Sequence, residues 1–131
     1  MPKIPQEIYS ECVQIAKDYY SLLDERKEIE RDILLGSTGP ADGMPRASTP
    51  GNPTAAKAEA LMREKARVDR TIHAIQDALE TLPDETARQV IRKNLFQHIP
   101  MHWINLPAPI ITMKRIRSAF IRQLARNLGK V

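Results

Sequence analysis

The sequence is poor in cysteine, in aromatic side chains and in long apolar runs. Its 131 residues include one Cys, two Phe and one Trp, so an intrachain disulfide is excluded and the core must be mostly aliphatic. No apolar run approaches the roughly 18 residues that a membrane-spanning helix needs, and the opening MPKIPQEIYS has no signal-peptide core. A single cysteine suits a reducing compartment. We therefore expect a cytoplasmic protein without membrane contact.

Arrangements of side chains that support catalysis or metal binding are also missing from the sequence. His98 and His102 are four residues apart, but Pro100 between them prevents a shared helical face. The glycines of residues 36–53 follow no strand pattern and precede no GK[ST] motif, which argues against a phosphate-binding loop. No nucleophile can be matched with a base. We expect no catalytic residue, no metal site and no cofactor.

Acidic residues are absent from the C-terminal part of the chain. Residues 1–83 hold eleven Lys/Arg against fourteen Asp/Glu, a net charge of −3, whereas residues 84–131 hold nine against two, a net charge of +7. The last stretch, from His98 to Val131, has six Lys/Arg and no acid. Such asymmetry indicates two parts with different functions, and the positive part is expected to attract phosphates.

Apolar residues at heptad spacing predict two long helices, over residues 1–35 and 54–82. Seven of eight seam positions are apolar in each helix, and the exceptions are Arg26 and Lys65. The two seams consist of Ile8, Cys12, Ile15, Tyr19, Leu22, Arg26, Ile29 and Ile33, and of Ala58, Leu61, Lys65, Val68, Ile72, Ile75, Leu79 and Leu82. Residues 36–53 contain four Gly and four Pro and predict a flexible loop. An antiparallel hairpin is expected. Either a second copy or the C-terminal domain should cover its flanks, and we favour a homodimer.

Residues 83–131 are predicted to form a small helical domain that resembles a helix-turn-helix. Its first helix carries apolar residues at helical spacing up to Phe96, and its second is basic, from Thr112 as N-cap to Lys130. Pro107 and Pro109 stand where the first helix and the turn of a standard motif would lie. The sequence therefore does not determine whether that first helix and turn form. The fold class is all-α: a coiled-coil-like hairpin followed by a helix-turn-helix-like domain.

The basic helix separates an apolar side from a polar side. The apolar side consists of Met113, Ile116, Phe120, Ile121, Leu124 and Leu128. The expected DNA-binding residues are Thr112, Lys114, Arg115, Ser118, Arg122 and Arg126. Lys114, Arg115 and Ser118 are suited to base edges, and Arg122 and Arg126 to the sugar-phosphate backbone. A merely solvated surface helix is the alternative, but such helices usually carry acids as well.

Two residues of this domain are predicted to be structural. Arg117 projects between Phe120 and Leu124 on the apolar side, where an unpaired charge would be costly. It should find a carboxylate, a carbonyl or a phosphate, and we expect it to pair with an acid such as Glu85. Trp103 is expected to anchor the core, with base stacking as a second interpretation.

The sequence resembles the small phage late-transcription regulators of the RinA/ArpU type. ADGMPRASTPGNPTAAKA is similar to their DGMPRG-type linker, and the opening EIYSECVQIAKDYYSL extends the resemblance over nearly the whole chain. Residues 79–131 resemble their sigma-factor region 4-like domain, through an LP pair, Phe96, Trp103, Thr112, Arg115-Ile116-Arg117, Phe120-Ile121, Leu124-Ala125 and Leu128-Gly129. The segment IPMHWINLPAPI departs from the pattern. The resemblance implies a phage or prophage protein that binds promoter DNA, activates late or packaging genes, and places Lys114, Arg115, Ser118 and Arg122 on the DNA.

Two other functions fit the same features. A small terminase-like packaging or assembly protein would share the hairpin and the basic end, and a ring of subunits would distinguish it. A protein-interaction module that contacts RNA polymerase would use the basic helix on an acidic partner. Its binding to duplex DNA would show no dependence on salt.

Overall fold

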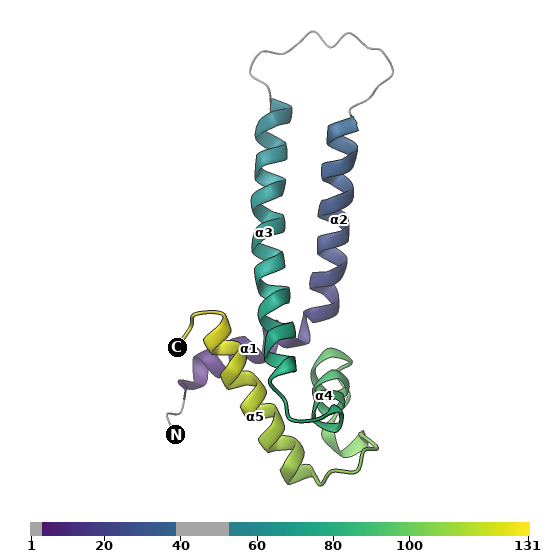
Figure 1. Cartoon of the computed structure of the whole chain (residues 1–131), viewed down its shortest axis with the longest axis vertical. Helices are drawn as coiled ribbons and strands as arrows, with labels where there is room; N and C mark the ends of the chain where they lie inside the picture. The colour runs from purple at the N-terminus through teal and green to yellow at the C-terminus, as the bar shows by residue number, and fades with distance from the viewer. Residues whose placement is uncertain (1–3, 39–52) are drawn as a thin grey trace.

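The computed structural model describes residues 4–38 and 53–131, and every regular element within them is helical. A two-helix hairpin, α2 and α3, projects from a small head that holds the other helices and both ends of the chain (Figure 1). The predicted all-α class, a hairpin followed by a small helical domain, is confirmed. The elements are α1 (Gln6–Lys17), α2 (Tyr19–Thr38), α3 (Pro53–Glu80), α4 (Glu85–Ile91), the short π-helix η1 (Arg92–Phe96), the short 3-10 helix η2 (Met101–Trp103) and α5 (Ile110–Asn127).

The hairpin is held together by aliphatic side chains that face each other between α2 and α3. Ile29, Val68 and Ile72 are buried, and Leu22 and Leu61 pack against them from the flanks. At about 1.5 Å per residue, the 28 residues of α3 reach roughly 42 Å. The predicted loop over residues 36–53 lies for the most part outside the described residues.

The head has one main core, to which α1, the lower part of α3, α4, η1 and α5 all contribute. Phe120 of α5 is fully buried and meets Phe96 of η1 edge-on, with ring centroids 6.4 Å apart. Phe96 in turn stacks on Tyr19, at the start of α2, at 4.4 Å. This aromatic chain joins α5 to the base of the hairpin. The predicted apolar side of the basic helix is thus the side that packs into the head.

The N-terminal helix predicted over residues 1–35 is wrong as a single element, because the chain bends at Asp18. The ψ of this residue is 8°, away from helical values. Its N–H bonds back to the carbonyl of Gln14, and its own carbonyl accepts from Leu22. Before the bend α1 packs on α5 and η1, and after it α2 packs on α3. The apolar spacing continues across the bend, so periodicity alone does not reveal it.

The two charged exceptions in the predicted seams meet in the hairpin. Asp69 accepts from Arg26 at 3.3 Å and from Lys65 at 2.8 Å. Lys65 also lies 3.7 Å from Glu30. Because Arg26 comes from α2 and Lys65 from α3, Asp69 joins the two helices at one level. A polar contact of this kind at a seam position fixes the register of paired helices.

The substitution Asp69→Asn is expected to destabilise the hairpin by about 1 kcal/mol at neutral pH, because Arg26 then loses its acid and Lys65 keeps only Glu30, at 3.7 Å. The hydrogen bond from Lys65 lowers the pKa of Asp69. Its carboxylate therefore stabilises the fold above its unfolded pKa of about 3.9. That contribution is lost as the pH falls through the lower folded pKa.

Urea unfolding at a series of pH values measures this effect. The control is Glu64→Gln, which removes an acid whose ion pair, with Arg67, stays on one helix. As the pH falls below about 4 and through the lower folded pKa of Asp69, the difference in unfolding free energy between the Asp69→Asn variant and the wild type should shrink to zero. A variant as stable as the wild type at neutral pH would contradict the prediction.

In the head, α4 and η1 lead to α5 through a long connection. Asp84 caps α4, since its side chain accepts from the Ala87 N–H at 2.8 Å. The connection over residues 97–109 contains η2 and both Pro107 and Pro109, and it is longer than the three or four residues of a standard helix-turn-helix turn. The head therefore has the helix order of that motif without its tight turn.

Candidate nucleic-acid interface

Helix α5 begins two residues before the predicted start. Its N-cap is Pro109, whose carbonyl accepts from the Met113 N–H at 3.0 Å, and no side chain caps the helix. The predicted capping role of Thr112 is therefore wrong, and Thr112 lies inside the first turn. The fixed φ of proline suits the entry into a helix, and the helix begins at the residue directly after this proline rather than after the threonine.

The face of α5 that points away from the core carries five of the predicted DNA-binding residues. We call them the α5 stripe: Lys114, Arg115, Ser118, Arg122 and Arg126. Lys114, Arg115 and Arg126 are exposed, and the other two are half-buried. At about 100° per residue the five fall within a 120° arc of the helix. The burial of Met113, Phe120, Ile121 and Leu124 on the other side holds this arc outward.

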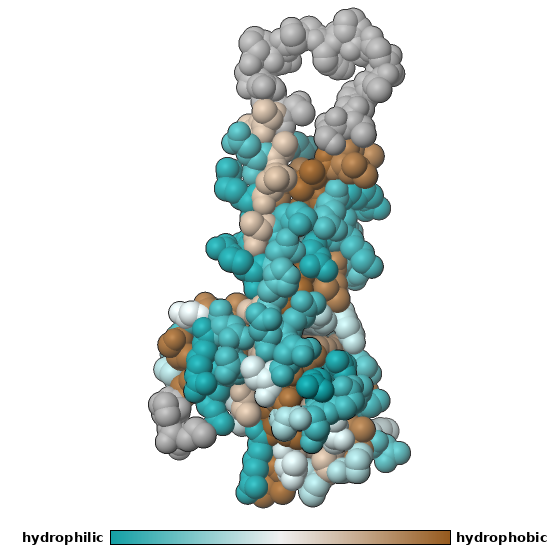
Figure 2. Space-filling model, viewed as in Figure 1, coloured by the Kyte–Doolittle hydropathy of each residue, from teal (hydrophilic) through white to brown (hydrophobic). Residues whose placement is uncertain are grey.

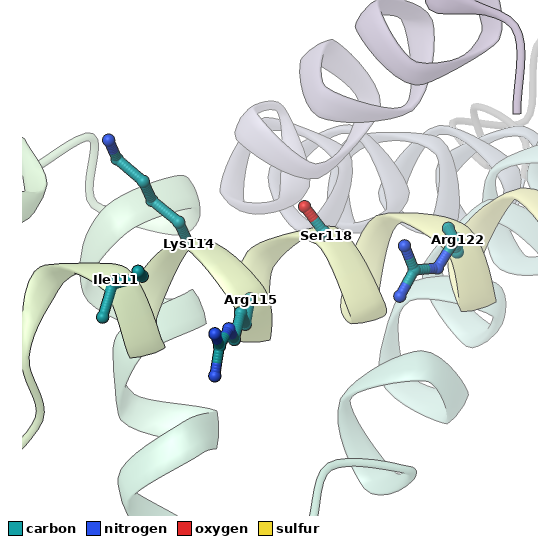
Figure 3. Close-up of a pocket in the computed structure, with 5 residues that line it drawn as sticks. All are labelled: Ile111, Lys114, Arg115, Ser118 and Arg122. Atoms are coloured by element: carbon teal, nitrogen blue, oxygen red, sulfur yellow. The ribbon is translucent and has the colours of Figure 1, made fainter. Parts of the chain in front are cut away.

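Four residues of the α5 stripe border a shallow depression of about 320 Å³. Its lining consists of Lys114, Arg115, Ser118 and Arg122 together with Ile111. Figure 3 shows these five side chains following one another along the helix, with the charged groups of Lys114 and Arg115 reaching outward. Thr112 and Arg126, the other two predicted site residues, lie outside the lining. Arg126 forms a hydrogen bond of 3.4 Å with Gln123.

The cations of the depression have no acidic partner in the part of the chain that the structure describes. Within residues 4–38 and 53–131, Lys114, Arg115 and Arg122 form neither an ion pair nor a side-chain hydrogen bond. The nearby α4 differs, since Arg88 and Arg92 both lie against Glu85. Unpaired guanidinium and ammonium groups keep all their donors available and add to one local field, so this face is suited to an anionic ligand.

Arg117 is structural, as predicted, but its expected partner is wrong. Its Nη1 donates to Oδ1 of Asn94 at 3.1 Å, and Asn94 donates through Nδ2 to the carbonyl of Ile99 at 2.9 Å. Glu85 instead binds Arg92 at 2.8 Å. Arg117 therefore ties α5 to η1 and, through Asn94, to the connection between them. A neutral amide was not foreseeable as its partner, because the periodicity of the chain does not place Asn94 opposite Arg117.

Trp103 does not anchor the core, contrary to the prediction. It is 73% exposed, and the next residue, Ile104, is buried in its place with Val90 and Met113. The turn of η2 packs against α5, so an exposed indole stands beside the basic helix.

His98 fastens the connection to α1. It has a positive φ of 61°, an uncommon conformation for a residue other than glycine. Its Nε2 lies 2.8 Å from the carbonyl of Lys17, at the last residue of α1. The end of α1 and the turn before η2 are thus held together, and α5 packs against both α1 and η2.

Within the described residues there is no cluster of three or more His, Cys, Asp or Glu that could hold a metal ion. None of the helices in that part of the chain is both long and apolar enough to cross a membrane. The candidate site is thus defined by cationic and apolar side chains of α5.

Neither a protein-family model, nor a curated protein, nor a solved structure matches the chain. What defines the protein is therefore its own architecture: a helical head that presents a basic helix, and a hairpin that projects from the head.

Proposed function

We propose that the protein binds double-stranded DNA through the exposed face of α5. The observation that carries the proposal is a set of cations, Lys114, Arg115 and Arg122, that have no acidic partner among the described residues and lie on a helix whose other side is fixed in the core. The 18 residues of α5 span roughly 27 Å. A major groove about 12 Å wide admits such a helix. Its side chains would meet phosphates and base edges together.

The position of each residue along α5 suggests its role. Lys114, Arg115 and Ser118 lie in the first half of the helix, the part of a recognition helix that reaches base edges. Arg122 and Arg126 lie further along and suit the sugar-phosphate backbone. Thr112 is in the first turn, where free backbone N–H groups also favour a phosphate. Side-chain length agrees, since the small Ser118 permits close approach.

The biological setting that we propose is transcription. The resemblance to phage late-transcription regulators supports an activator of late or packaging genes that acts in the cytoplasm of a bacterial host, with RNA polymerase as a second partner. No catalytic activity is part of this proposal. The exposed Trp103 offers a contact surface for the polymerase beside the DNA-facing helix.

A homodimer through the hairpin completes the proposal. Leu34, Leu35 and Met62, near the distal end of the hairpin, are each more than half exposed. Figure 2 shows the apolar surface at this end of α2, next to the weakly apolar upper part of α3. The mass of the assembly in solution separates the two DNA-binding functions. A dimer agrees with a regulator, and a closed ring of many subunits would favour a packaging protein.

Binding to duplex DNA at several salt concentrations tests the proposed function. A protein that neutralises Z phosphates gives a slope of log K against log salt near −0.9Z. We expect Arg122→Ala to make this slope shallower by about 0.9. The control is Arg63→Ala, which removes the same charge from an exposed position on the hairpin and should leave the slope unchanged. A wild-type affinity that ignores salt would overturn DNA binding and leave an interaction module.

A further inference from the structure

One apolar side chain lies among the polar residues of the α5 depression. Ile111 is 62% exposed, and it lines the depression together with Lys114, Arg115, Ser118 and Arg122. Figure 3 shows it in the first turn of α5, beside Lys114 and Arg115. At about 100° per residue, Ile111 falls in the middle of the arc that these four residues span. It therefore lies on the midline of the binding face, at the end where α5 begins.

The chemistry of the major groove limits what such a side chain can contact. The edges of the bases present hydrogen-bond donors and acceptors, and thymine adds an apolar group, its C5-methyl. An isoleucine can neither donate nor accept a hydrogen bond, so its favourable partner on this surface is that methyl group. Removing both groups from water stabilises the contact, whereas Ile111 opposite a bare polar edge gains nothing.

We propose that Ile111 is a specificity-determining residue that packs against the methyl group of a thymine in the target site. This inference rests on the proposed DNA binding by α5. Arg115 follows Ile111 by one helical turn, about 6 Å along the axis. It is suited to the O6 and N7 atoms of a guanine one or two base steps away, at about 3.4 Å per step. The target would then hold a thymine close to a guanine.

The experiment begins with selection of duplexes from a randomised pool by the wild-type protein. In the selected duplex each thymine is then replaced by deoxyuridine, one at a time, which removes the methyl group and keeps every hydrogen-bonding atom. At one position the deoxyuridine duplex should bind the wild type about fourfold more weakly than the thymine duplex does. This is the affinity ratio expected for burying one methyl-sized group. Ile111→Ala should bind both duplexes equally.

A matched control is the neighbouring isoleucine. Ile110 is 44% exposed and does not line the depression, so Ile110→Ala should keep the fourfold response to deoxyuridine. Arg115→Ala should lose the guanine preference and keep the response. Equal wild-type affinity for every thymine and deoxyuridine duplex would overturn the role of Ile111 while DNA binding stands. A pool from which no duplex is retained would overturn the proposed function itself.

Discussion

The variant Phe120→Ala should lose about 3–5 kcal/mol of unfolding free energy, the usual cost of deleting a buried aromatic side chain. Phe120 is fully buried, and it links α5 to Phe96 and so to Tyr19 at the base of the hairpin. Its removal leaves a cavity between α5 and η1 in the core of the head. Since whole domains are stable by only about 5–15 kcal/mol, a substantial part of the head should unfold at physiological temperature. Chemical denaturation followed by circular dichroism measures this loss.

Tyr20→Ala is the control for that experiment. Tyr20 also touches Phe96, with ring centroids 6.0 Å apart, but it is 45% exposed. Tyr20→Ala should lower the unfolding free energy by less than half as much as Phe120→Ala, because truncation at a half-exposed position leaves no closed cavity. A loss below about 1 kcal/mol for Phe120→Ala would contradict the packing described for the head.

The variant Asn94→Leu should destabilise the head by about 2 kcal/mol, because it removes the partner of a charged group. Arg117 then keeps its guanidinium in a half-buried place without the Oδ1 acceptor, and the carbonyl of Ile99 loses its donor. Gln97→Leu makes a similar change at an exposed position close by and should be nearly neutral. Thermal or urea unfolding of the two variants gives the comparison.

A double-mutant cycle with Arg117→Met separates the interaction from the burial of each side chain. If the two residues act as a pair, the double variant should lose less unfolding free energy than the two single variants together. The difference should be about 1 kcal/mol or more. Strict additivity would mean that Arg117 is stabilised by something other than Asn94. The DNA affinity of the double variant should change little, since neither residue belongs to the α5 stripe.

The helical architecture could be predicted because periodicity is a local property. The spacing of Leu61, Val68 and Ile72 shows one apolar face on α3, and the same logic assigns Phe120 and Leu124 to the buried face of α5. The bend at Asp18 could not be predicted in this way. It exists because α1 and α2 pack on different partners, and the spacing of apolar residues does not say which partner each one meets.

The candidate site was partly accessible from the sequence for the same reason. Lys114, Arg115, Ser118 and Arg122 follow from helical spacing and the lack of acids, and the structure brings them together in one depression. Ile111 was missed because the predicted helix started after it. Contacts between distant segments, such as that between Arg117 and Asn94, depend on how the connection folds back, which no local pattern specifies.

The continuity of α3 has a mechanical consequence. The same helix supplies Val68 and Ile72 to the hairpin core and Ile75 and Leu79 to the core of the head. The hairpin and the head are therefore connected by one continuous helix, with no break at which the two could bend relative to each other. Each residue inserted into a helix turns what lies beyond it by about 100°. The number of residues along α3 thus sets the angle at which the distal hairpin faces relative to α5. In a pair of molecules joined by their hairpins, that angle would fix how the two α5 helices are oriented relative to each other. It would therefore set the helical position and the spacing of the two sites that they can reach on one duplex.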